Sequence, residues 1–129
     1  MIKTIKNNIL SIVIAFIILY LSLANSNTID AVTFFTFPYI DKVVHFGMYL
    51  TLMLSLLFEH RYTNNQLKGQ LLMAILPAAY GILLEIIQKY FTETRSGDIV
   101  DALFNIIGVL VALTLWRFFI KNRRSENQM

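Results

Sequence analysis

Four apolar runs alternate with short polar stretches along this chain of 129 residues. The pattern predicts helices at approximately 8–25, 42–59, 70–91 and 99–120. A helix that crosses a bilayer needs about 20 mostly apolar residues, with a range of roughly 17–25. We therefore predict an all-α membrane protein with a single domain over residues 1–129. Its fold would be a bundle of four transmembrane helices joined by short loops.

The first apolar run has a second interpretation, a cleaved signal peptide. Ser22 and Ala24 are small residues at a spacing suited to cleavage. The run is long for the apolar part of a signal peptide, however, and the rest of the chain is itself membrane-like. We favour a retained first helix.

The composition supports the membrane class and narrows the partners. Hydrophobic residues make up 57% of the chain and charged residues 15%, against roughly 45–50% and about 25% in soluble domains. The chain has no cysteine, which excludes disulfides and thiolate metal sites. A net charge of +3 is too small to indicate nucleic acid. The lipid bilayer is the expected partner, and no nucleic acid is expected.

The distribution of basic residues predicts an orientation. With four helices, eight of the eleven lysines and arginines fall on the side of the two termini. These are Lys3, Lys6, Arg61, Lys68, Arg117, Lys121, Arg123 and Arg124. Because basic residues concentrate on the cytoplasmic side of membrane proteins, we predict that both termini are cytoplasmic.

Polar side chains interrupt the second, third and fourth apolar runs at comparable depth. They are Asp41, Lys42, His45 and Tyr49 in the second helix, Glu85 and Gln88 in the third, and Asp101 and Asn105 in the fourth. Asp41, His45 and Tyr49 recur at every fourth residue and share one helix face. Ionisable residues in membrane helices normally face the bundle interior. Together with Arg95, from the polar turn between the third and fourth helices, these side chains predict a polar pocket at the outer ends of three helices.

The chemistry of this pocket is left open between three roles. His45 and Glu85 are the candidate catalytic residues, since a histidine and a carboxyl in a low-dielectric site can exchange protons. With Asp41 and Asp101 they could also hold a divalent cation, but their spacing matches no compact metal motif. We predict no metal and no cofactor. The polar groups would bind a ligand, serve a hydrolase or transferase, or only link the helices.

Three segments in this order resemble the VanZ-like family. They are D-K-V-V-H-F-G-M-Y from Asp41, E-I-I-Q from Glu85, and R-S-G-D-I-V-D-A-L-F-N-I-I-G from Arg95, which ends at Gly108. The resemblance covers about half of the chain. The positions that the family implies are Asp41, Lys42, His45, Tyr49, Glu85, Gln88, Arg95, Asp101, Asn105 and Gly108.

The VanZ-like family comprises small bacterial membrane proteins and takes its name from a teicoplanin resistance protein. The resemblance implies a multi-pass protein of the bacterial inner (cytoplasmic) membrane, linked in some members to lowered glycopeptide sensitivity at the cell envelope. It implies no settled biochemical activity. We expect an extracytoplasmic-side pocket that binds or modifies an envelope lipid or a peptidoglycan-related group, such as a peptidoglycan precursor. The substrate, the oligomeric state and any enzymatic activity stay open.

Overall fold

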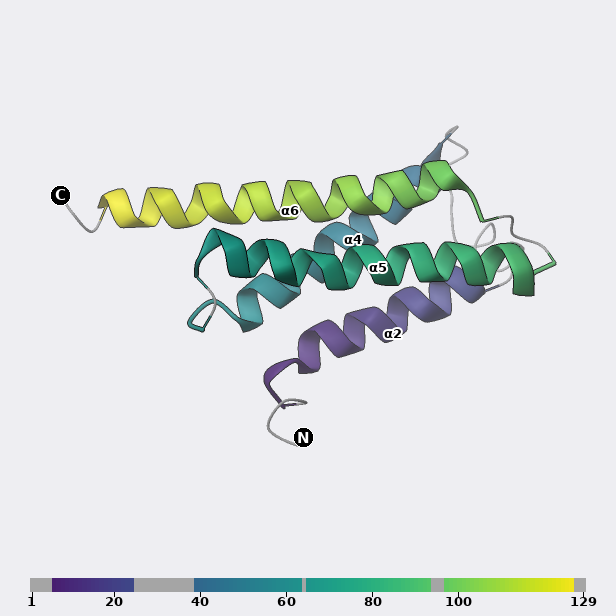
Figure 1. The fold of residues 1–129 in the computed structure, drawn as a ribbon, viewed down its shortest axis with the longest axis horizontal. Helices are drawn as coiled ribbons and strands as arrows, with labels where there is room; N and C mark the ends of the chain where they lie inside the picture. Colours follow the sequence, from purple (N-terminus) through teal and green to yellow (C-terminus); the bar gives the residue numbers. More distant parts are fainter. Residues whose placement is uncertain (1–5, 25–38, 64, 94–96, 127–129) are drawn as a thin grey trace.

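The structure, a computed structural model, describes residues 6–24, 39–63, 65–93 and 97–126. Within these ranges the chain forms four α-helices, as the hydrophobic pattern predicts (Figure 1). The helices are α2 (Ile9–Leu23), α4 (Ile40–Glu59), α5 (Leu67–Phe91) and α6 (Ile99–Glu126).

The four helices differ in their capacity to span a membrane. By length and composition, α4, α5 and the part of α6 up to Ile120 can each cross a bilayer. Helix α2 is apolar but has only 15 residues. Its rise of about 22 Å is less than the roughly 30 Å of a hydrocarbon core. The predicted first helix was longer, and its last residue, Asn25, lies outside the described residues.

Helix α4 is central to the packing. Both α4 and α5 contact each of the other three helices, and the most extensive contact is between α4 and α6, whereas α2 packs mainly on α4 and α5. In Figure 1 α5 lies between α6 and α2, with α4 behind them. The buried apolar core comprises Ile18, Tyr49, Leu52, Met53, Leu57, Ala74, Leu84, Val109, Ala112 and Leu113.

Large apolar side chains also cover the outside of the bundle. Phe16, Leu76 and Phe118 are 66%, 65% and 60% exposed, and many other large apolar side chains are also exposed. Soluble monomers rarely expose apolar surface on this scale. This outer surface is suited to contact with lipid chains.

The contact between α4 and α6 depends on a glycine. A Cβ atom added at Gly108 would lie 2.5 Å from the carbonyl oxygen of Phe46 and 3.1 Å from the backbone nitrogen of Leu50. Small residues at such positions let two helix backbones approach closely in membrane proteins. Gly108 therefore sets the separation of α4 and α6.

An acidic residue of α4, Glu59, binds the N-terminus of α2. One carboxylate oxygen of Glu59 accepts the Leu10 N–H at 2.7 Å, and the other accepts the Ser11 N–H at 3.3 Å and the Ser11 hydroxyl. The Ser11 hydroxyl also lies 3.0 Å from that of Ser55. The first N–H groups of a helix have no partner within the helix and carry partial positive charge. Glu59 supplies these groups with an acceptor.

We expect Gly108→Ala to destabilise the bundle, because the added methyl group meets the backbone of α4. Overpacking of this kind costs about 1–3 kcal/mol. Gly47→Ala is the matched control, since a Cβ there has nothing within 4 Å. Thermal unfolding of the purified variants in detergent measures both. Equal midpoints for the two variants would contradict the assigned role of Gly108.

Candidate functional site

The polar residues of three helices meet at one end of the bundle. Because α4 and α6 begin where α5 ends, the first two turns of α4 and α6 lie beside the last two turns of α5 (Figure 1). We call the group that gathers there the polar cluster. It consists of Asp41, Lys42, His45, Glu85, Asp98, Asp101 and Asn105.

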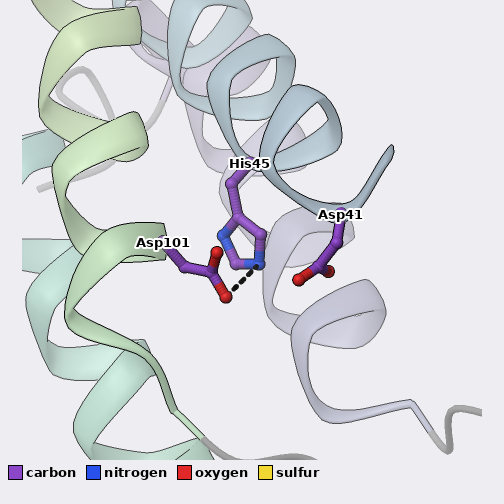
Figure 2. Close-up of side chains that lie close together, drawn as sticks. All are labelled: Asp41, His45 and Asp101. Atoms are coloured by element: carbon purple, nitrogen blue, oxygen red, sulfur yellow. Dashed lines mark ion pairs between the residues drawn. The ribbon is translucent and has the colours of Figure 1, made fainter. Parts of the chain in front are cut away.

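His45 lies at the centre of the polar cluster and is only 4% exposed. Its Nδ1 atom is 3.1 Å from Asn105 Oδ1 and 3.3 Å from Glu85 Oε1. Its Nε2 atom faces Asp101 Oδ2 at 4.0 Å (Figure 2). With an oxygen of Asn105 and an ionised Glu85 as its neighbours, Nδ1 is placed to donate a proton. In the neutral ring, Nε2 then has the lone pair.

Glu85 connects the end of α5 to the turn before α6. Its Oε2 atom accepts the backbone N–H of Asp98 at 3.2 Å, while Oε1 faces His45. Gly97 makes this contact feasible, because a Cβ there would collide with the carbonyl oxygen of Glu85. The carboxylate of Glu85 is therefore held on two sides.

Lys42 and the aspartates form the outer edge of the polar cluster. The Lys42 ammonium is 3.1 Å from Asp101 Oδ1 and 3.6 Å from Asp98 Oδ2. Asp98 also caps α6, since its Oδ1 accepts the Val100 N–H at 3.0 Å. Asp41 is exposed, and its carboxylate points toward His45 and Asp101 (Figure 2). The edge can thus be reached from outside the bundle.

Tyr49 lies one turn further along α4 than His45 and is 1% exposed. A Cβ added at Gly81 would lie 3.0 Å from both the Tyr49 ring and the Asn105 amide nitrogen. Among the described residues, the Tyr49 hydroxyl has no hydrogen-bond partner. Tyr49 separates the polar cluster from the apolar core.

One residue predicted for the pocket, Gln88, contacts another helix, and a second, Arg95, lies outside the described residues. Gln88 is buried, and its amide donates to the carbonyl oxygen of Ser22 at 2.7 Å. This bond links α5 to α2.

Sequence reasoning did not include Asp98 or Gly97 in the pocket. Asp98 had a signal, because an aspartate directly before an apolar run is typical of a helix N-cap. Gly97 had none, since its role depends on how close the turn comes to α5. The close approach to Glu85 is visible only in three dimensions.

Three grooves lie away from the polar cluster. The most polar, of about 560 Å³, is lined by residues that include Tyr62, Gln66 and Lys68. The other two are mainly apolar. One, of about 510 Å³, is lined by residues that include Phe58, Arg61 and Trp116. The other, of about 400 Å³, lies between α2, α4 and α5 and includes Ser11 and Pro77. These two linings suit acyl chains. We place the candidate site at the polar cluster because buried ionisable side chains from three helices meet there.

We expect Gln88→Leu to lower stability, because the buried Ser22 carbonyl loses its donor. Hydrogen bonds between membrane helices contribute about 0.6 kcal/mol on average and up to about 1.7. Tyr80→Phe is the matched variant, since the Tyr80 hydroxyl donates from α5 to the Ala15 carbonyl of α2 at 2.7 Å. Thermal midpoints in detergent should fall by similar amounts. An unchanged midpoint for Gln88→Leu would contradict its role in holding α2.

A scan against models of protein families matches the VanZ/LLP1 model over residues 3–120. No curated protein and no solved structure matches the chain. The matched region includes α2, α4, α5, the part of α6 up to Ile120 and the whole polar cluster. With nearly its full length matched and three helices that can span a membrane, the chain belongs to the VanZ/LLP1 family.

Proposed function

We propose that this protein binds the polar head group of an envelope lipid or a peptidoglycan-related precursor at the polar cluster. The binding lowers the sensitivity of the cell to glycopeptides such as teicoplanin. The observation that carries the proposal is the burial of His45 between Glu85, Asp101 and Asn105, which come from two other helices. Membership of the VanZ/LLP1 family supports the placement in the envelope.

The energetics favour a ligand over a purely structural role. Ionisable residues within membrane helices are costly, and they commonly mark functional sites. A hydrogen bond between membrane helices returns about 0.6 kcal/mol on average. Glu85 and Asp101 are 7% and 5% exposed. Linking helices is therefore a weak reason to bury both acids beside a histidine.

The depth of the polar cluster suits a head group. Asp41 and Asp101 lie in the first turns of α4 and α6, and Glu85 precedes the end of α5 by six residues, about 9 Å. The head-group layer on each side of a bilayer is about 5–8 Å thick. A lipid head group at the membrane surface can reach the exposed Asp41 and Asp98 without entering the apolar core.

A hydrolase or transferase is the second candidate. The observation in its favour is the contact of 3.3 Å between His45 Nδ1 and Glu85 Oε1, which suits a pair that transfers a proton. Turnover of the bound lipid would distinguish this activity from binding alone.

The proposal places the polar cluster on the extracytoplasmic side and both termini in the cytoplasm. The start of α2, the α4–α5 connection and the end of α6 lie at the opposite end of the bundle from the cluster (Figure 1). Arg61, Lys68 and Arg117 belong to that opposite end. Since basic residues favour the cytoplasmic side, the cluster faces outward.

Single cysteines test this orientation, because the chain has none of its own. We expect Glu93→Cys, which follows α5, to react with a membrane-impermeant maleimide in intact cells. Thr63→Cys, in the α4–α5 connection, should react only after the membrane is opened. Both positions are exposed, so access is decided by the side of the membrane. The reverse labelling pattern would overturn the orientation.

Head-group binding is tested by native mass spectrometry of the protein purified in detergent. We expect the wild type to retain an envelope lipid, and His45→Ala and Glu85→Gln to lose it while they still accumulate in the membrane. His60→Ala is the control for loss of a histidine away from the cluster, because His60 lies at the opposite end of the bundle and, among the described residues, its ring hydrogen-bonds the Leu56 carbonyl of its own turn. Teicoplanin susceptibility of expressing cells should follow lipid retention.

Two results would count against the proposal. If His45→Ala retains the same lipid as the wild type, the polar cluster is not the binding site. If the His45 and Glu85 variants fail to accumulate at all while His60→Ala is normal, the cluster serves to hold the helices together.

A further inference from the structure

Three side chains of the polar cluster present one ligand atom each to a common space. A carboxylate oxygen of Asp41, a ring nitrogen of His45 and a carboxylate oxygen of Asp101 all lie within 4.8 Å of one another. Figure 2 shows both carboxylates on the Nε2 side of the ring. His45 and Asp101 are buried, whereas Asp41 is exposed. The group is thus closed toward the core and open toward the outside.

The ring of His45 is oriented as in a metal ligand. Metal-bound histidines almost always donate their other ring N–H to a carboxylate or carbonyl oxygen, which fixes the tautomer. Nδ1 of His45 has such partners, Glu85 Oε1 at 3.3 Å and Asn105 Oδ1 at 3.1 Å. The lone pair of Nε2 then faces the space shared with Asp41 and Asp101 (Figure 2).

Nε2 lacks a hydrogen bond of its own in the described part of the chain. The distance from Nε2 to Asp101 Oδ2 is 4.0 Å, which is beyond hydrogen-bond range. Asp101 Oδ1 is occupied by the Lys42 ammonium at 3.1 Å, so Oδ2 is the oxygen left to face the ring. A ring nitrogen of the buried His45 and two carboxylate oxygens therefore face one another, while the nearby Lys42 ammonium is bonded to the other oxygen of Asp101.

The charges of the polar cluster favour a cation at this point. It contains four carboxylates, those of Asp41, Glu85, Asp98 and Asp101, and one ammonium, that of Lys42. With all four carboxylates ionised and a neutral imidazole, the described members carry an excess of three negative charges. Unpaired charge is costly in a low-dielectric site. A divalent ion would offset most of this excess.

We propose that Asp41, His45 and Asp101 bind a divalent transition-metal ion, such as Zn²⁺. One imidazole and two carboxylates are a competent donor set for Zn²⁺, and three protein ligands leave a position open for an exogenous ligand. Bonds of about 2.0–2.1 Å in a tetrahedral site place ligand atoms roughly 3.3 Å apart. The separation of 4.0 Å between Nε2 and Oδ2 needs to close by less than about 1 Å. Asp41 is exposed and free to adjust.

The ion also explains how an acidic site takes an anionic ligand. A phosphate or pyrophosphate head group would be repelled by four carboxylates, but a bound divalent ion with an open position coordinates phosphate oxygens. Lys42, next to Asp101, adds a second positive charge at the edge. This assignment of the head group rests on the proposed function, whereas binding of the ion itself does not.

Calorimetric titration of Zn²⁺ into the full-length protein, purified in detergent and stripped with a chelator, tests the site. We expect one saturable equivalent per chain. Asp41→Asn should weaken binding by about tenfold or more, and because Asp41 is exposed this variant keeps the fold. Asp98→Asn is the matched control, since it removes a carboxylate from the same edge and asparagine caps helices as well as aspartate does. It should bind Zn²⁺ within about twofold of the wild type.

Absence of saturable Zn²⁺ binding to the wild type would overturn the site. Equal losses in Asp41→Asn and Asp98→Asn would also overturn it, since only general negative charge would attract the ion. Lipid retention, measured on the same stripped and Zn²⁺-loaded samples, separates the two proposals. Zn²⁺ binding without any lipid sustains the metal site alone, and retained lipid without Zn²⁺ binding sustains the proposed function alone.

Discussion

The close contact between α4 and α6 at Gly108 is the constraint on which the rest of the structure depends. Gly108 follows Asn105 by three residues on α6 and lies against the backbone of Phe46, the neighbour of His45. Any side chain there would force the two helices apart. The distances from His45 to Asn105 and from Lys42 to Asp101 exist because these backbones are so near. Gly108, which has no polar side chain, thus determines how closely the charged and polar side chains of α4 and α6 approach one another.

The polar cluster divides its contacts between the two ring nitrogens of His45. Glu85 and Asn105 hold Nδ1 from within the bundle, while Asp41 and Asp101 face Nε2 at the open edge. The inner contacts fix the ring, and the outer face is left for a ligand. This arrangement is typical of sites in which buried polar groups position a reactive or ligating atom. It also explains why the polar residues lie within two turns of the helix ends.

The sequence predicted the helices well, because apolar runs of this length have few alternatives. It also predicted that Asp41, His45, Glu85 and Asp101 lie at one level, since helix direction alternates along the chain. It could not predict partners that depend on helix rotation and crossing. Sequence spacing did not show that Gln88 contacts α2 instead of joining Asp41 and His45. The first helix was predicted over residues 8–25 because flanking polar residues could extend a slightly short apolar run, whereas α2 ends at Leu23.

Helix α2 is bonded near its two ends to two different helices. Glu59 of α4 holds its first turn, and Gln88 of α5 holds the carbonyl of Ser22 in its last turn. A helix fastened in this way acts as a diagonal brace across α4 and α5. Sliding of α4 along α5 would have to break one of the two attachments. Helix α2 therefore helps to fix the distance between His45 and Glu85, although its bonds to Glu59 and Gln88 involve neither of these two residues.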